Sequence, residues 1–182
     1  MPQAPHPADE SRRQATLDQL GLLDTGADPV FDELVRRAAS TFDTPMAAIS
    51  LVDRDRQWFK ARVGLDVEQT PRSCAICAYC ILGEGPLVIQ DTKQDPGVAD
   101  NPLVAGPPHL RFYAGAPIRW TDGQHIGSLC TLDTRPRNPS AKQIERLIEL
   151  AQEVSYAIDH HFLRLCAKQW QDLGLNGDAL AA

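Results

Sequence analysis

Apolar side chains occupy every second position from Leu110 to Trp120, and small or polar residues stand between them. A period of two is typical of a β-strand that packs one face on a hydrophobic core. Asp122-Gly123 follows as a hairpin turn, because glycine adopts the positive φ that tight turns require. A second strand is predicted over residues 125–133. This hairpin is the central element of the expected fold.

The pattern leaves the register of the hairpin open. A slip of one residue would move Cys130 from the face opposite Phe112 to the same face. Small residues gather near the middle of both strands: Ala114, Gly115, Ala116, Gly127 and Ser128. They have two explanations, close packing against helices and a ligand that lies on the sheet.

Three further strands are expected before the hairpin. Residues 46–53 form a short apolar run, and residues 56–64 alternate, so a turn joins two strands there. Residues 86–90 make a third, short strand. We expect residues 65–73 to be loop, and the turn-rich segment 91–108 has room for one short helix near residues 99–104.

Helices are predicted at both ends of the chain. The first covers residues 9–20. The second begins at the cap Asp28, with Pro29 in its first turn, and ends before Pro45. The last begins with a capping-box pattern, Ser140 followed by Gln143.

The apolar face of the last helix continues to Leu165. Four of its members recur every seven residues: Ile144, Ala151, Ile158 and Leu165. A helix this long outruns a small sheet, so its distal half needs another partner. The candidates are the N-terminal helix and a second copy of the chain, and we expect a homodimer through the terminal helices.

Together these elements predict an α+β domain with an antiparallel sheet and helices on both faces. We expect residues 1–8 to be disordered, residues 9–166 to form one domain with flanking helices, and residues 167–182 to be a tail. The length of 182 residues suits a single domain with a sizeable core.

The composition is ordinary for a globular protein, with 43% hydrophobic and 23% charged residues. The net charge of −6 argues against binding to nucleic acid or to a membrane surface. No apolar run approaches the roughly 20 residues that span a bilayer, and the N-terminus lacks the apolar region of a signal peptide. We therefore expect a cytoplasmic protein whose five cysteines are free thiols, ligands or redox groups.

Three of these cysteines, Cys74, Cys77 and Cys80, are spaced so that a helix over residues 74–82 would turn them to one side. They have three interpretations: buried apolar filler, a thiol redox pair, or a zinc or iron–sulfur site to which Cys130 adds a ligand if the register allows. If the helix begins near Cys74, its free backbone amides make Cys74 the most thiolate-like. Cys77 would then be the resolving partner and Cys130 the most inert.

Several separated motifs resemble those of the GAF domain family, in particular bacterial domains that often precede histidine kinases or diguanylate cyclases. The motifs are LGLLDTGADPVFDEL from Leu20, ISLVDRDRQWFKARVGLD from Ile49, TPR at 70–72, DNPLVAGPPHLRFYAGAPI from Asp100, and GSLCTLDTRPR from Gly127. The resemblance implies a six-stranded antiparallel sheet, with helices on one face and a ligand-sized pocket under loops on the other. It implies small-molecule sensing and does not name the molecule.

The resemblance also implies site residues. In SCAICAYCI (73–81), Cys77 stands where the family usually has a cysteine, and Tyr79 stands where it usually has a histidine. Asp91 and Asn101 belong to a D…DP…ADNP pattern. With Cys74 and two hairpin residues, the candidate ligand-binding set is Cys74, Cys77, Tyr79, Asp91, Asn101, Phe112 and Ala114. The candidate metal ligands are Cys74, Cys77 and Cys80.

Three functions remain open. The first is a sensor or regulatory module that binds a small molecule and signals through its terminal helices, with a separate signalling protein as a partner. Because the chain ends soon after the last helix, we expect this module to stand alone. The second is a redox or metal sensor built on the three cysteines, and the third is a cysteine-dependent reductase of free methionine sulfoxide, an activity of one branch of GAF-fold proteins. No phosphate loop, HExxH or Ser-His-Asp order is present, so hydrolase, kinase or cyclase activity is not expected.

Overall fold

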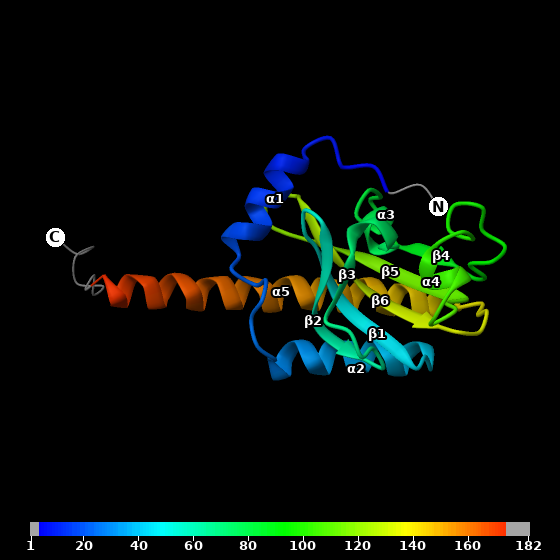
Figure 1. Cartoon of the computed structure of the whole chain (residues 1–182). Helices are drawn as coiled ribbons and strands as arrows, with labels where there is room; N and C mark the ends of the chain where they lie inside the picture. The colour runs from blue at the N-terminus through cyan, green and yellow to red at the C-terminus, as the bar shows by residue number, and fades with distance from the viewer. Residues whose placement is uncertain (1–3, 174–182) are drawn as a thin grey trace.

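The computed structural model describes residues 4–173 of the chain (Figure 1). In chain order its elements are α1 (Glu10–Gln19), α2 (Pro29–Phe42), β1 (Met46–Val52), β2 (Arg56–Val63), β3 (Gln69–Pro71), the 3-10 helix η1 (Arg72–Cys74), α3 (Cys77–Cys80), β4 (Leu87–Ile89), α4 (Pro102–Ala105), β5 (Phe112–Arg119), β6 (His125–Asp133) and α5 (Ala141–Asp172).

Six strands form one sheet in the order β3-β2-β1-β6-β5-β4, and every neighbouring pair is antiparallel. The predicted hairpin is present as β5 and β6, paired from Phe112 opposite Asp133 to Arg119 opposite His125. The two central strands, β1 and β6, are buried along their whole length. The predicted α+β class with an antiparallel sheet of six strands is confirmed.

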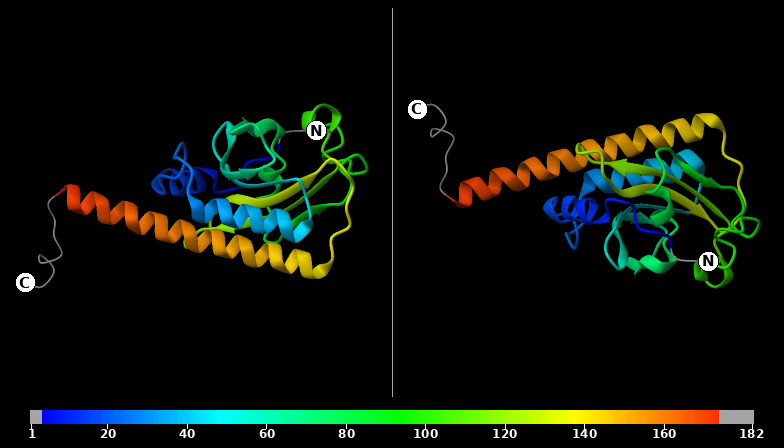
Figure 2. Two further views of the ribbon diagram at one scale, coloured as in Figure 1. Left: turned by 90° about the horizontal axis from the view of Figure 1, so that it is seen from below. Right: turned by 90° about the horizontal axis from the view of Figure 1, so that it is seen from above.

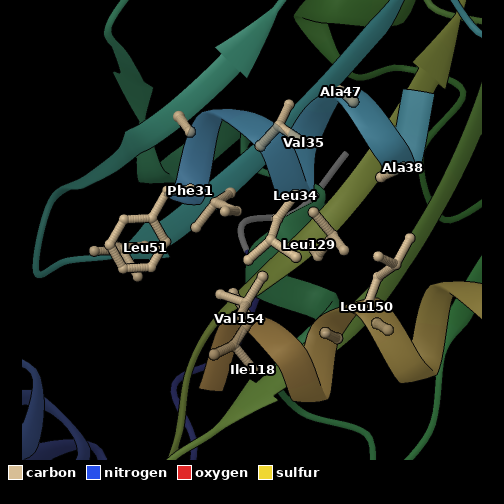
Figure 3. Close-up of a cluster of buried hydrophobic side chains, with 14 of the residues drawn as sticks. Phe31, Leu34, Val35, Ala38, Ala47, Leu51, Ile118, Leu129, Leu150 and Val154 are labelled. Atoms are coloured by element: carbon tan, nitrogen blue, oxygen red, sulfur yellow. The ribbon is translucent and has the colours of Figure 1, made fainter. Parts of the chain in front are cut away.

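One face of the sheet is covered by α2 and α5, which lie side by side (Figures 1 and 2). Both helices begin at the predicted caps. The Asp28 carboxylate accepts a hydrogen bond from the Val30 amide at 3.0 Å, and Ser140 and Gln143 form the capping box. Their apolar stripes meet the sheet in one large core, where side chains such as Leu34 and Leu150 face the strands (Figure 3).

The opposite face is covered by short elements, which are η1, α3, α4 and the loops around them. They close a second, smaller core of mainly aliphatic, aromatic and cysteine side chains. Helices therefore lie on both faces of the sheet, as expected. The hairpin register turns Cys130 toward this second core and Phe112 toward the first, so these two residues lie on opposite faces.

The N-terminal helix α1 is attached to the domain through a buried ion cluster. Arg13 Nε lies 2.7 Å from Glu10 Oε2, and Arg72 Nη1 lies 2.5 Å from Glu10 Oε1. Both guanidinium groups are almost fully buried. Arg72 Nη1 also donates to the backbone oxygen of Asp53 at 2.9 Å. One carboxylate therefore joins α1 to η1 and to the end of β1.

Two predictions for the segment between β2 and β5 were wrong. Residues 65–73 contain β3 as well as loop, because Gln69–Pro71 pairs with the start of β2. Residues 74–82 do not form one helix. Cys74 ends η1, Ala75 is extended, and α3 begins only at Cys77. The short helix expected near residues 99–104 is α4, which begins at Pro102 behind the capping side chain of Asn101.

The last helix is longer than predicted and runs to Asp172 instead of ending near Leu165. Residues 166–172 contain no glycine or proline and include good helix formers, so nothing in them stops the helix. Part of the predicted tail is therefore helical, and residues 174–182 lie outside the described residues. Residues 1–3 of the segment predicted to be disordered also lie outside them, whereas Ala4 is buried in the second core.

Of the helices in residues 4–173, none is both long and apolar enough to cross a membrane.

Candidate functional site

The face of the sheet that α2 and α5 leave uncovered holds a cavity of about 90 Å³. Its walls come from β2, β3, β5 and β6, from α3 and α4, and from the loops that contain residues 65–67 and 108–110. Most of the wall is apolar, including Phe59, Leu110 and Leu132. Val67 also lines it and is 51% exposed, so this residue stands where the cavity meets solvent. A single water needs roughly 10–15 Å³ in such a measure, so the cavity has room for a small molecule.

One polar side chain in the wall has an unused acceptor. Gln57 is buried, and its Nε2 donates a hydrogen bond to Thr70 Oγ1 at 3.1 Å. Its Oε1 is buried without a hydrogen-bond partner among the described residues. Buried acceptors normally have a partner, so this oxygen is suited to a donor on a bound molecule.

Two thiols meet at the floor of the cavity. Cys77 Sγ lies 3.7 Å from Cys130 Sγ, and both residues line the cavity and are buried. The Tyr113 hydroxyl donates to Cys77 Sγ at 3.4 Å and lies 3.4 Å from Ser128 Oγ. Gly115 makes this possible, because a Cβ at that position would lie only 2.3 Å from the Tyr113 hydroxyl oxygen. The small residue therefore accommodates the tyrosine that contacts the thiol pair.

The two thiols of this pair differ in acidity. The hydrogen bond with Cys130, and those with Ser128 and Tyr113, lower the pKa of Cys77 below that of an ordinary thiol, although burial acts in the opposite direction. The hydrogen bond with Cys77, together with burial, raises the pKa of Cys130. Cys77 is therefore the member of the pair that ionises first.

The other two cysteines of the spaced trio are less acidic. Burial raises the pKa of Cys80 to about 12 and also raises the pKa of Cys74. Cys74 was expected to be the most thiolate-like because it would begin a helix. That expectation is wrong, since Cys74 lies in η1 and its Sγ donates to the Pro71 backbone oxygen at 3.2 Å. The helix that follows begins at Cys77.

Phe112 and Ala114 were predicted to bind the ligand, and the structure places both on the other side of the sheet. Their side chains are fully buried in the core beneath α2 and α5. The alternation along β5 was interpreted correctly as a strand. Both of its faces are buried, however, and the cavity lies on the face of Tyr113.

Of the remaining predicted ligand-binding residues, Cys77 lines the cavity, whereas Cys74, Tyr79, Asp91 and Asn101 do not. Asp91 forms a bidentate ion pair with Arg111, at 2.8 and 2.7 Å.

Asn101 has a structural role in the same region. It is fully buried, caps α4 through the Leu103 amide at 2.8 Å, and donates to the Cys74 backbone oxygen at 2.9 Å. Asn101, which belongs to the D…DP…ADNP pattern, therefore holds α4 against η1, beside the cavity.

The predicted metal site on Cys74, Cys77 and Cys80 has no counterpart in the geometry. Within residues 4–173, no group of three or more His, Cys, Asp or Glu side chains is arranged to hold a metal ion. The three cysteines are divided between η1 and α3, and Cys77 contacts Cys130 instead.

Sequence reasoning missed Gln57 and Tyr113 as site residues. Both belong to strands whose two faces are buried, so the apolar alternation carried no sign of which face holds a cavity.

Small residues in the hairpin are explained by packing, because a Cβ at Gly127 would lie 2.0 Å from the Ser50 backbone oxygen on the neighbouring strand.

Solved structures with the same fold come from several bacterial proteins. The blue-light-absorbing GAF domain of PixJ from Thermosynechococcus elongatus aligns with a TM-score of 0.63 at 16% identity, covering 85% of this chain and 94% of that one. The GAF domain of an Acinetobacter phosphoenolpyruvate-protein phosphotransferase aligns with a TM-score of 0.60 at 19% identity, covering 80% and 93%. The free methionine-R-sulfoxide reductase of Neisseria meningitidis aligns with a TM-score of 0.58 at 18% identity, covering 87% and 96%. At these identities the likeness concerns the fold alone.

A curated relative is much closer in sequence. It is a cyclic di-GMP phosphodiesterase of Pseudomonas aeruginosa, 51% identical over 145 residues, which cover 80% of this chain and 25% of that protein. The chain thus spans about a quarter of the length of this relative. The family model of the GAF domain matches residues 27–158, which include all six strands and the larger part of the sheet's helical cover. The chain therefore belongs to the GAF domain family.

Proposed function

We propose that this GAF domain is a sensor or regulatory module that binds a small, largely apolar molecule in the cavity above Cys77 and Cys130. The observation that carries the proposal is the cavity itself, which is walled by apolar side chains and has one buried acceptor, Gln57 Oε1, without a hydrogen-bond partner within residues 4–173. An apolar pocket with a few polar groups is the usual form of a small-molecule site. The matching ligand has a compact apolar body and one hydrogen-bond donor.

The wall of the cavity argues against a nucleotide ligand. In the part of the chain that the structure describes, no lysine or arginine lines the cavity, and a cyclic dinucleotide would bring two phosphate charges into an apolar enclosure. Its volume is also far below the roughly 300–1,000 Å³ of typical ligand pockets. The substrate in the name of the Pseudomonas relative is therefore not the ligand that we propose for this cavity.

Phenol and toluene test the proposed ligand chemistry, because they have similar shapes and phenol alone carries a donor. We expect phenol to raise the melting temperature more than toluene does, since a ligand that binds only the folded state stabilises it. Gln57→Leu removes the acceptor and is expected to abolish this preference. Equal effects of the two probes on the wild-type chain would contradict the assigned role of Gln57.

Two matched valines test the location of the site. Val67 is 51% exposed at the mouth of the cavity, and Val30 is 53% exposed on α2, on the other side of the sheet. We expect Val67→Trp to block the mouth and remove phenol binding in calorimetry, and Val30→Trp to leave it unchanged. Loss of binding in both variants, or in neither, would place the site elsewhere.

A second part of the proposal is a homodimer through the projecting half of α5. The seven-residue repeat that includes Ala151 and Ile158 faces the core, since both side chains are buried. A different repeat is exposed, in which Tyr156, Leu163 and Trp170 follow one another at intervals of seven. Apolar residues at such intervals supply one of the two heptad positions that form the seam of a coiled coil.

The C-terminal part of α5 runs past the sheet (Figure 1), whereas Tyr156 lies beside α2 and lines a surface pocket with Leu34 and Arg37. Leu173, three residues after Trp170, is also exposed and extends the seam. We commit to a second copy of α5 as the occupant, because two identical seams are self-complementary in a parallel pair. The sequence also suggested α1 as part of the dimer contact. This contact does not require α1, since α1 is attached to its own domain through Glu10.

Leu163→Glu tests the dimer, with Lys168→Glu as its control on a face of α5 that the seam does not use. We expect light scattering with size exclusion to show a dimer for the wild-type chain and the control, and a monomer for Leu163→Glu. A monomeric wild-type chain at tens of micromolar would contradict the proposal. Ile158→Glu is not a useful variant, because it would place a charge in the core.

The other functions expected from the sequence stay predictions. The fold likeness to the Neisseria reductase shows a shared fold and does not carry its activity to this chain. A cytoplasmic location, a separate signalling partner and the absence of nucleotide turnover stay predictions as well. A redox role no longer rests on the spaced trio of cysteines, because the structure pairs Cys77 with Cys130.

A further inference from the structure

We propose that Cys77 and Cys130 are a site of reversible oxidation, where a small peroxide entering the cavity converts the two thiols into an intramolecular disulfide. The bond would join α3 to β6 across the floor of the cavity. A consequence for ligand binding rests on the proposed function, whereas formation of the disulfide does not.

The two sulfur atoms are close enough for the bond to form with a small movement. They are 3.7 Å apart, and a disulfide of about 2.05 Å requires them to approach by roughly 1.7 Å. Cys130 lies on β6, a central strand that is paired on both sides. Cys77 begins a helix of only four residues, flanked by turns. The movement is therefore expected in α3, with β6 as the fixed partner.

The reaction needs a peroxide and no other oxidant. The thiolate sulfur of Cys77 attacks one oxygen of hydrogen peroxide, the O–O bond breaks, and Cys77 becomes a sulfenic acid while hydroxide leaves. The sulfur of Cys130 then attacks the sulfur of Cys77 and displaces the sulfenic hydroxide, which leaves as water with the proton of Cys130. The hydroxide from the first step takes up the proton that Cys77 lost on ionising, so two thiols and one peroxide give one disulfide and two waters.

The surroundings assign the first step to Cys77. The Tyr113 hydroxyl donates to the sulfur of Cys77 at 3.4 Å, so it can stabilise the thiolate. The sulfur of Cys130 accepts from Cys77 at 3.7 Å and donates to the Ala48 backbone oxygen at 3.6 Å. The lowered pKa of Cys77 and the raised pKa of Cys130 agree with this order. Once Cys77 is an uncharged sulfenic acid, it no longer opposes ionisation of Cys130, and Cys130 can attack.

The cavity provides access for the oxidant. Both cysteines line it, and its volume of about 90 Å³ exceeds the roughly 10–15 Å³ that a water needs. Hydrogen peroxide is small and uncharged, and it can enter where the cavity meets solvent at Val67. The other buried thiols are less suited, because Cys74 donates to the Pro71 backbone oxygen and burial raises the pKa of Cys80 to about 12.

Mass-mapped oxidation of the chain tests the disulfide directly. A Cys166→Ser background removes the thiol on α5, which lies outside the site. After treatment with hydrogen peroxide and alkylation, we expect the intact chain to lose two thiol hydrogens, and digestion to give a peptide pair linking Cys77 to Cys130 that dithiothreitol separates. Linkage between other cysteines, or Cys77 oxidised to sulfinic acid without linkage, would overturn the proposal.

Two single variants sharpen the assignment. Cys130→Ser removes the resolving thiol, so Cys77 is expected to remain a sulfenic acid and to be labelled by dimedone several-fold more than in the parent chain. Cys80→Ser is the matched control, a buried cysteine on the same helix, and is expected to keep the Cys77–Cys130 linkage. Equal dimedone labelling of parent and Cys130→Ser would overturn the role of Cys130. If a variant fails to fold by circular dichroism, the mapping of the parent chain decides alone.

Phenol binding separates this inference from the proposed function. The disulfide draws α3 toward β6 and narrows the cavity, so the oxidised chain is expected to bind phenol at least about tenfold more weakly than the reduced chain. Unchanged binding by a fully linked chain would overturn the coupling while the disulfide stands. Absence of phenol binding by the reduced chain would overturn the proposed function instead.

Discussion

On one face of the sheet, the long helices α2 and α5 lie over fully buried aliphatic and aromatic side chains. On the other face, the strands are covered by η1, α3 and α4, which are only three or four residues long. The first face is packed as a continuous core. The second encloses a cavity of about 90 Å³. A long amphipathic helix can fill the surface of a sheet along its whole length, while short helices joined by loops leave gaps between them.

The two faces also differ in what holds their cover in place. Helices α2 and α5 are attached to the sheet mainly by apolar burial, and Arg37 of α2 pairs with Glu153 of α5 at 2.6 Å. The short elements bury a smaller apolar core and add buried polar contacts. Asn101 joins α4 to the backbone of η1, and Glu10 joins α1 to Arg72. The GAF domain therefore places stability on one side of the sheet and the candidate site on the other.

The largest predicted effect compares two leucines on the same strand. Leu129 faces α2 and α5, and Leu132 lines the cavity. We expect Leu129→Ala to lower the free energy of unfolding by about 3–5 kcal/mol and Leu132→Ala by about 1–3 kcal/mol, because a side chain beside an existing cavity loses fewer contacts. Urea denaturation with a common slope measures both. A larger cost at Leu132 would contradict the proposed division between the faces.

A smaller effect is expected from the ion cluster under α1. Burial opposes ionisation of Glu10, but hydrogen bonds from Arg13 and Arg72 outweigh it and lower the pKa of Glu10 from 4.5 to about 2. Glu10→Gln leaves two buried guanidinium groups without their carboxylate. We expect the free energy of unfolding to fall by about 1–3 kcal/mol at neutral pH, which is less than for a fully buried ion pair because Glu10 is partly exposed.

The same cluster has a defined pH dependence. Because the folded-state pKa of Glu10 is depressed, its contribution is present above pH 4.5 and is lost as the pH falls toward about 2. The difference in stability between the wild-type chain and Glu10→Gln should therefore shrink over that interval in chemical denaturation. A difference that stays constant down to pH 2 would show that the charge of Glu10 is not what attaches α1.

The smallest stability effect is expected at Tyr113, where the consequence for chemistry is greater. Tyr113→Phe removes one hydroxyl that contacts Cys77 and Ser128, and we expect it to cost about 1 kcal/mol of stability. Loss of this donor should raise the pKa of Cys77 and slow its oxidation by peroxide several-fold at neutral pH. The oxidation rate of Cys77 is measured by alkylating the remaining thiols at timed intervals after peroxide is added. An unchanged rate would remove Tyr113 from the site.

The sequence by itself determined the elements and most of their boundaries. The alternation of β5 and β6, the turn at Asp122-Gly123 and the caps Asp28 and Ser140 are local signals, and each appears in the structure where it was predicted. Helix α5 ran past its predicted end because helix formers continue beyond Leu165. The short strand β3 was missed because three residues carry too little periodicity to be recognised.

The location of the site was decided by tertiary structure alone. Both faces of β5 are buried, so the alternation could not show that the cavity lies on the side of Tyr113 and not on that of Phe112. Nor could spacing along the chain show that Cys77 meets Cys130, 53 residues away, instead of its neighbours Cys74 and Cys80. Periodicity along the chain indicates which residues are buried. The register of the sheet and the length of the elements that cover it decide which buried side chains contact one another and where a cavity remains.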